Sequence, residues 1–159
     1  MLVVCRDVVQ APNDKQQIEP VLDQLTGLPE TLGKAETLLA DSGYFSQANV
    51  EACAKTEITP LIAPGRERHN RPWKDRFAAA PPEPDDPTPV QAMQYRLATP
   101  EGRKLYALRK QTPEPVFGII KSVMGFRQFH PRGLQQVKGE WSLVTMAWNM
   151  KRMFALSQP

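Results

Sequence analysis

Cysteine is scarce in this chain. Only Cys5 and Cys53 occur among its 159 residues, and they stand far apart without a CxxC spacing. Two cysteines so placed fit neither a disulfide framework nor a zinc site. Their scarcity is typical of proteins of the reducing cytosol, so the sequence predicts a cytoplasmic location.

Long apolar runs and histidine clusters are also lacking. No run approaches the roughly 18 residues that a membrane-spanning helix needs. The apolar start at residues 2–4 is too short for a signal peptide, and its basic residue follows the run instead of preceding it. His69 and His130 have no metal-ligand spacing to another His or Cys. We therefore expect no membrane attachment and no zinc centre.

Basic charge is abundant near the C-terminus. The net charge is +3, yet residues 101–159 hold ten Lys or Arg and three acids, which gives +7 and leaves −4 for residues 1–100. A basic C-terminal third predicts a polyanionic partner such as nucleic acid. The alternative is a set of helix ends that are simply rich in Lys and Arg.

The order of predicted elements indicates an α/β domain. Short, apolar and often β-branched segments predict strands at 2–9, 38–40 and 58–63. Helical spacing of apolar residues predicts helices between these strands and in most of the chain after residue 88. The last helix, expected over 134–156, carries Leu134, Val137, Trp141, Val144 and Trp148 in one stripe. We expect both tryptophans to be core residues and not base-stacking platforms.

Asp41 stands out by its position. It follows the continuous apolar run Leu38–Ala40, which is typical of a strand covered on both faces. In α/β sheets, ligands bind beyond the carboxyl ends of such strands. The alternative is a turn residue whose carboxylate binds its own backbone, a common use of Asp before Gly.

Glu114 is the second notable acid. Thr112 is expected to cap a helix that Pro113 begins, which puts Glu114 in the first turn, where the helix dipole favours negative charge. Gly118 and Lys121 share its face. An acid, an open gap and a cation along one face could hold a metal and a nucleic-acid backbone. The alternative is a capped surface helix with solvated side chains.

Residues 64–89 differ in composition from the rest. A basic stretch with two interleaved aromatic residues is followed by a proline-rich one. The basic stretch could track a nucleic-acid strand, whereas the alternative is a disordered insertion. We expect one domain over residues 1–159 with a flexible insertion at about 64–89.

The two acid-bearing segments, in this order, resemble catalytic blocks of bacterial insertion-sequence transposases of the DDE type. Leu38–Tyr44, with Asp41 followed by Ser-Gly-Tyr, resembles the second block. Tyr106-x2-Arg109 followed by Glu114-x6-Lys121 resembles the third block, the Y-R-E-K pattern. The flanks of that block are similar too, at Gln111–Gly118, Gly125–Arg127, Arg132–Leu134 and Glu140–Trp141. The resemblance covers nearly the whole chain and implies a truncated RNase H-like fold, with a short mixed sheet flanked by helices and long C-terminal helices.

The resemblance also implies a chemistry. DDE transposases cut and rejoin DNA with two divalent metal ions, Mg²⁺ or Mn²⁺. Asp41 and Glu114 would be the catalytic, metal-binding acids here. The residues that would contact DNA are Tyr106, Arg109, Lys110, Lys121, Arg127 and Arg132. The expected partners are element ends, target DNA and, for the complete enzyme, a second copy, with the protein associated with the nucleoid.

Two departures from the family pattern matter. Four residues separate Arg109 from Glu114 where the family has three, so Arg109 and Lys110 are alternatives for the family arginine. The first catalytic Asp of the family has no counterpart, because Asp7 lies within a predicted strand and Asp14 lies at a helix entry. We therefore expect a truncated transposase with little activity alone. The competing hypothesis is a non-enzymatic nucleic-acid-binding module.

Overall fold

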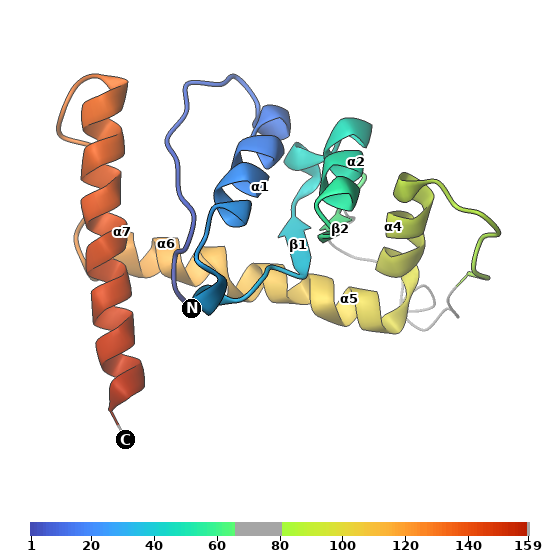
Figure 1. Ribbon diagram of the computed structural model, residues 1–159. Helices are drawn as coiled ribbons and strands as arrows, with labels where there is room; N and C mark the ends of the chain where they lie inside the picture. The colour runs from blue at the N-terminus through green and yellow to red at the C-terminus, as the bar shows by residue number, and fades with distance from the viewer. Residues whose placement is uncertain (66–80, 159) are drawn as a thin grey trace. The chain divides into compact units, whose positions relative to one another are not determined.

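The computed structural model describes residues 1–65 and 81–158 (Figure 1). The chain forms two compact units: a sheet unit, Asn13–Arg109, and a helical unit made of Met1–Pro12 and Lys110–Pro159. Its elements are mixed α and β, as the sequence predicts. Among the described residues, the helices of the sheet unit are α1 (Ile18–Thr26), α2 (Gln47–Lys55), α4 (Pro89–Ala98) and α5 (Pro100–Ala107), and those of the helical unit are α6 (Pro113–Ser122) and α7 (Leu134–Ser157).

The sheet consists of two parallel strands, β1 (Thr37–Ala40) and β2 (Thr59–Ile62), which differs from the mixed sheet that the resemblance implied. Leu39 pairs with Leu61, and Ala40 pairs with Ile62. Because side chains alternate along a strand, the two pairs face opposite sides. The hydrophobic core of the sheet unit is therefore divided between the two faces of the sheet.

Each face of the sheet has its own hydrophobic cluster. Ala40 and Ile62 pack with Val50 of α2 and Met93 of α4. On the other face, Leu61 packs with Tyr106 of α5, and half-buried Leu39 adjoins that cluster. β1 is therefore covered on both faces, as its continuous apolar run predicts. This packing fixes the position of Asp41, the residue that follows β1.

Local signals set where several helices begin. Ser46, Thr88 and Thr99 are N-caps whose hydroxyl oxygens accept the backbone N–H three residues on. Thr88 also forms a complete capping box with Gln91. Pro89 and Pro100 occupy the first position of their helices, where a missing N–H costs no hydrogen bond.

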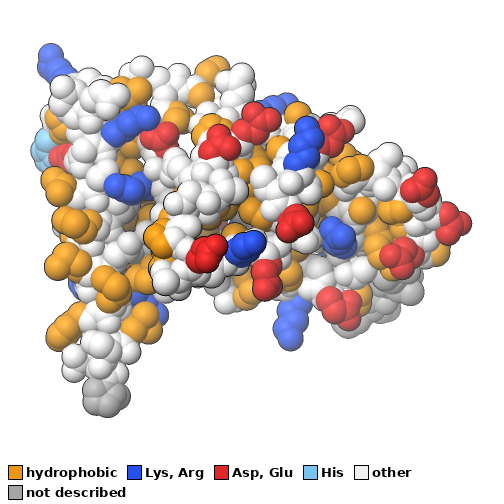
Figure 2. Space-filling view, viewed as in Figure 1, with side chains coloured by type: hydrophobic (Ala, Val, Ile, Leu, Met, Phe, Trp, Pro, Cys, Tyr) orange, Lys and Arg blue, Asp and Glu red, His pale blue; other side chains and the backbone are white. Residues whose placement is uncertain are grey.

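The helical unit is built around the contact between α6 and α7. Val116 and Ile120 of α6 form a buried cluster with Trp148 of α7, and half-buried Trp141 packs against it. The prediction of tryptophans in the core is thus confirmed for Trp148. Figure 2 shows hydrophobic side chains running along α7 on a face that is open to solvent; Leu143, Met146, Met150 and Met153 are among its exposed residues.

The predicted strand at 2–9 is wrong, since these residues are not part of any sheet. The side chain of Asn149 on α7 makes the backbone hydrogen bonds that a neighbouring strand would make. Its Oδ1 accepts the N–H of Val3 at 2.8 Å, and its Nδ2 donates to the carbonyl of Val3 at 2.7 Å. An ion pair between Asp7 Oδ1 and Lys138 Nζ, 2.9 Å apart, holds the same segment to α7.

The insertion expected at 64–89 falls mostly on residues 66–80, which lie outside the described part of the chain. From Pro81, the described backbone has no helix or strand until α4 begins at Pro89. Across the described residues, no helix is both long and apolar enough to cross a membrane.

Candidate functional site

Asp41 lies at the carboxyl end of β1 and caps the 3-10 turn Ser42–Tyr44. Its Oδ1 accepts the backbone N–H of Gly43 at 2.9 Å. The turn role that sequence reasoning kept as an alternative is therefore present. This hydrogen bond leaves the rest of the Asp41 carboxylate accessible, because the side chain is 53% exposed. Its Oδ2 lies 4.0 Å from the Arg109 guanidinium.

Tyr106 and Arg109 form the other side of this arrangement. The Tyr106 hydroxyl donates to the carbonyl of Ala40 at 3.1 Å, and the residue is only 8% exposed. The guanidinium carbon of Arg109 lies 5.4 Å from the centre of the Tyr106 ring, within cation–π range. A buried side chain thus joins the end of α5 to the end of β1 and supports the arginine that faces Asp41.

A second carboxylate, which sequence reasoning set aside, lies near Asp41. A Cβ placed on Gly43 would lie 3.1 Å from Asp41 Oδ1 and 3.4 Å from Asp14 Oδ2. Both carboxylates affect the adjacent Tyr44. Burial raises the pKa of the Tyr44 hydroxyl, and the negative charges of Asp14 and Asp41 raise that pKa further. The turn is therefore acidic, with Gly43 leaving room for both carboxylates.

Glu114 and Lys121 lie on α6, in the helical unit. Glu114 is exposed in the first turn and Lys121 is exposed in the last. Between them Gly118 is open, since a Cβ there would have no neighbour within 4 Å. The predicted capping by Thr112 is wrong: its backbone is already in the helical region, so its side chain makes no cap hydrogen bond. Pro113 does begin the helix, as predicted.

The remaining predicted cations are exposed residues of the helical unit. Lys110 lies in the 3-10 segment Leu108–Gln111, which precedes α6. Arg127 and Arg132 lie in the loop between α6 and α7. That loop is fixed by Glu140 of α7, whose carboxylate accepts the N–H of His130 at 3.0 Å and lies 2.8 Å from His130 Nδ1.

The predicted site residues therefore fall into two groups, each within one unit. The sheet unit brings Asp41, Tyr106 and Arg109 together, whereas Glu114 and Lys121 belong to the helical unit. In the described part of the chain, no three or more His, Cys, Asp or Glu side chains are grouped so that they could hold a metal ion.

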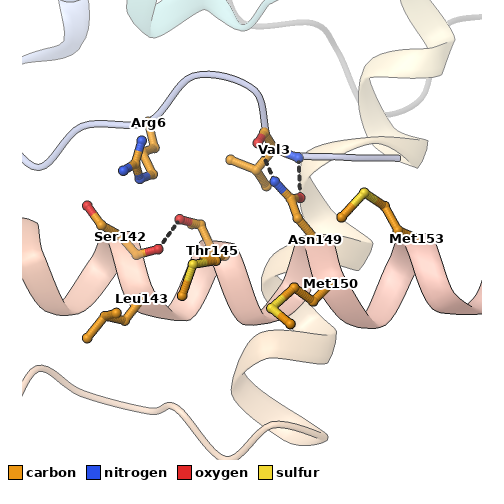
Figure 3. A pocket seen from close by; sticks show the side chains of 9 residues that line it. Val3, Arg6, Ser142, Leu143, Thr145, Asn149, Met150 and Met153 are labelled. Carbon is orange, nitrogen blue, oxygen red and sulfur yellow. Dashed lines mark hydrogen bonds between the residues drawn. The ribbon is translucent and has the colours of Figure 1, made fainter.

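A pocket of about 440 Å³ is present in the helical unit (Figure 3). One side is the N-terminal segment with Val3 and Arg6, and the other is a mostly apolar strip of α7 from Ser142 to Met153. None of the predicted site residues lines it.

Sequence reasoning missed two features near these sites. The proximity of Asp14 to Gly43 depends on the fold and has no local signal in the sequence. Phe117 did have a local signal in the sequence, because it stands three residues after Glu114 and four before Lys121, on the same side of α6. It is an exposed aromatic residue next to the predicted acid.

Comparison with known proteins bears on the part of the chain that holds α4 to α7. Residues 83–154 match the family described as transposase DDE domain. The match includes the predicted third block from Tyr106 to Lys121, whereas Asp41 lies upstream of it. No curated protein and no solved structure matches the chain. Residues 83–154 are therefore similar to a transposase DDE domain, which is consistent with the C-terminal part of a DDE transposase.

Proposed function

We propose that this chain is part of a transposase that cleaves and joins DNA strands by phosphoryl transfer. The observation that carries the proposal is the match of residues 83–154 to the transposase DDE domain, since that range includes Arg109, Glu114 and Lys121. The arrangement at the end of β1 supports it, because a cation held beside an exposed carboxylate suits a phosphate-binding, metal-dependent site.

Asp41 and Glu114 are the residues that would hold Mg²⁺ or Mn²⁺. Both are exposed, and carboxylate oxygens are the ligands that these hard cations prefer. Asp41 keeps acceptor capacity, because a carboxylate has about four lone-pair sites and the Gly43 N–H takes one. When bound, a pair of such ions activates the attacking hydroxyl group and stabilises the leaving oxygen.

The basic residues would bind the DNA backbone. Arg109 is suited to grip a phosphate near Asp41, because the buried Tyr106 ring supports its guanidinium and restricts where it can lie. The role of Tyr106 in this proposal is to position Arg109. The other phosphate contacts are assigned to Lys110, Lys121, Arg127 and Arg132, all of them exposed.

A non-enzymatic nucleic-acid-binding module remains the second candidate. The +7 charge of residues 101–159 favours it, because that charge attracts DNA with or without a metal site. The two candidates differ in one measurable respect: a transposase site couples DNA binding to metal through Glu114, and a simple basic module does not.

We therefore expect Mg²⁺ at constant ionic strength to tighten DNA binding by the chain, and Glu114→Gln to remove that tightening. Fluorescence anisotropy with a labelled duplex measures both affinities. Glu101→Gln is a matched control, because Glu101 also follows Thr-Pro in the first turn of a helix. Equal Mg²⁺ responses in the wild type and in Glu114→Gln would reject the metal site and favour the second candidate.

For the complete enzyme we propose that a second copy, the element ends and the target DNA are the partners. The place of action that follows is the nucleoid, in the cytoplasm.

A further inference from the structure

An aromatic cluster lies beside Glu114 and Lys121 in the helical unit. Its members are Phe117 of α6, Phe126 and Phe129 of the following loop, and Trp141 of α7. Phe117 and Trp141 are stacked, with ring centres 5.8 Å apart and planes 5° from parallel. Phe129 meets Phe126 and Trp141 edge to face, at 5.4 and 6.2 Å. The cluster is therefore an ordered surface rather than a set of separate side chains.

The cluster has an inner and an outer part. Trp141 and Phe126 are half-buried against the hydrophobic core of the helical unit. Phe117 is 46% exposed and Phe129 is 41% exposed. Since Phe117 has Trp141 stacked on it, it is held in a fixed orientation while nearly half of its surface remains open. A single exposed Phe is ordinary, but one that is oriented by a stacked partner is suited to bind another flat ring.

The charges around this surface indicate what kind of flat ring Phe117 would bind. Lys121 is one helical turn beyond Phe117, and the exposed Arg127 and Arg132 flank Phe129 in sequence. The described acids of this unit other than Glu114 are engaged by cationic or imidazole partners: Asp7 binds Lys138, and Glu140 binds His130. Positive charge beside stacked aromatic rings is the combination that binds single-stranded nucleic acid, through phosphates and bases respectively.

We propose that Phe117, supported by Trp141, is a stacking platform for an unpaired base of a DNA strand. Lys121 and Arg127 bind the phosphates on either side of that base. The inference rests on the proposed function, in which DNA is the substrate, and it adds that this face of α6 takes bases outside a duplex. Base pairs stacked inside a duplex do not offer the face that Phe117 needs.

The test compares two single-stranded oligonucleotides that carry equal charge: oligo-dT and an abasic strand of the same length. We expect the full chain to bind oligo-dT more tightly. Phe117→Leu should weaken oligo-dT binding about 5- to 150-fold, the range for one base–aromatic stack, and leave abasic binding unchanged. Lys121→Ala should weaken both, because it removes a phosphate contact. Fluorescence anisotropy measures all six affinities, of three proteins for two strands.

Two further variants control this comparison. Phe154→Leu changes a more exposed Phe on α7 and should leave both affinities unaltered. Phe117→Tyr keeps a ring of the same size and should bind oligo-dT as the wild type does. Equal wild-type affinities for the two strands, or equal losses on both strands in Phe117→Leu, would overturn the stacking platform while leaving DNA binding intact. Absence of binding to either strand would overturn the proposed function as well.

Discussion

At the scale of single residues, the described contact that most defines the candidate site is the hydrogen bond from Tyr106 to the carbonyl of Ala40. It is buried and joins residues 66 positions apart in the sequence. The bond fixes the end of α5 to the end of β1, so the geometry of Arg109 and Asp41 depends on it. A residue that resembles a family DNA contact thus has a structural task as well.

Tyr106→Phe should therefore lower the free energy of unfolding by about 1–2 kcal/mol. The ring and its packing stay, but the Ala40 carbonyl loses this buried donor. Urea denaturation followed by circular dichroism measures the change. Tyr95→Phe, at a half-buried position on α4, is the control and should stay within about 0.5 kcal/mol of the wild type. A Tyr106→Phe variant as stable as the wild type would show that the bond contributes nothing.

At the scale of elements, the N-terminal segment shows how tertiary contacts decide local structure. Residues 2–9 have the composition of a strand, yet Asn149 takes the backbone groups of Val3 and Lys138 binds Asp7. The ion pair has a pH signature. The hydrogen bond from Lys138, with smaller help from the Val8 N–H and from the charge of Lys138, lowers the pKa of Asp7 against a weaker opposing effect of burial.

A lowered folded-state pKa means that the Asp7 pair stabilises the protein above the unfolded pKa and is lost as pH falls through the folded value. Comparison of Asp7→Asn with the wild type should give a melting temperature lower by about 1–3 °C at pH 6–7, as for a partly exposed pair. The difference should begin to shrink below about pH 4, near the unfolded pKa, and should be lost as pH falls through the lower folded pKa. Thermal melts across pH 3–7 measure it; a constant difference would contradict the assignment.

The elements also show what the sequence could predict. The helix starts at Ser46, Thr88 and Thr99 are set by local signals, because a cap hydrogen bond spans only three residues. The apolar run of β1 correctly predicted cover on both faces. The fate of residues 2–9 could not be predicted, since it depends on Asn149, which lies 146 residues away from Val3.

The candidate site likewise has some features that local sequence predicts and others that depend on tertiary packing. The turn at Asp41 and the face of α6 with Glu114, Gly118 and Lys121 follow from local spacing. The support of Arg109 by Tyr106 required the packing of α5 on the sheet, which no local pattern contains.

At the scale of the whole molecule, the positive charge predicts DNA binding, whereas the small number of assigned acids predicts slow strand cleavage. The excess of positive charge in residues 101–159 would attract DNA with or without a metal, because phosphate contacts need no metal. Strand cleavage needs carboxylates that together neutralise two metal ions. The resemblance implies three acids for the family and assigns two of them, Asp41 and Glu114, in this sequence. Binding and cleavage should therefore separate in this chain.

We expect the purified 159-residue chain to bind DNA but to cleave it very slowly in Mg²⁺ or Mn²⁺. A missing carboxylate weakens metal binding, and the rate falls with it because the leaving oxygen is then poorly stabilised. Gel analysis of an end-labelled duplex, beside anisotropy on the same DNA, measures cleavage and binding together. Asp41→Ala is the matched control, since contaminating nuclease would cleave equally in both samples. Robust Mg²⁺-dependent cleavage by the wild type that Asp41→Ala abolishes would show instead that the acids of this chain suffice for catalysis.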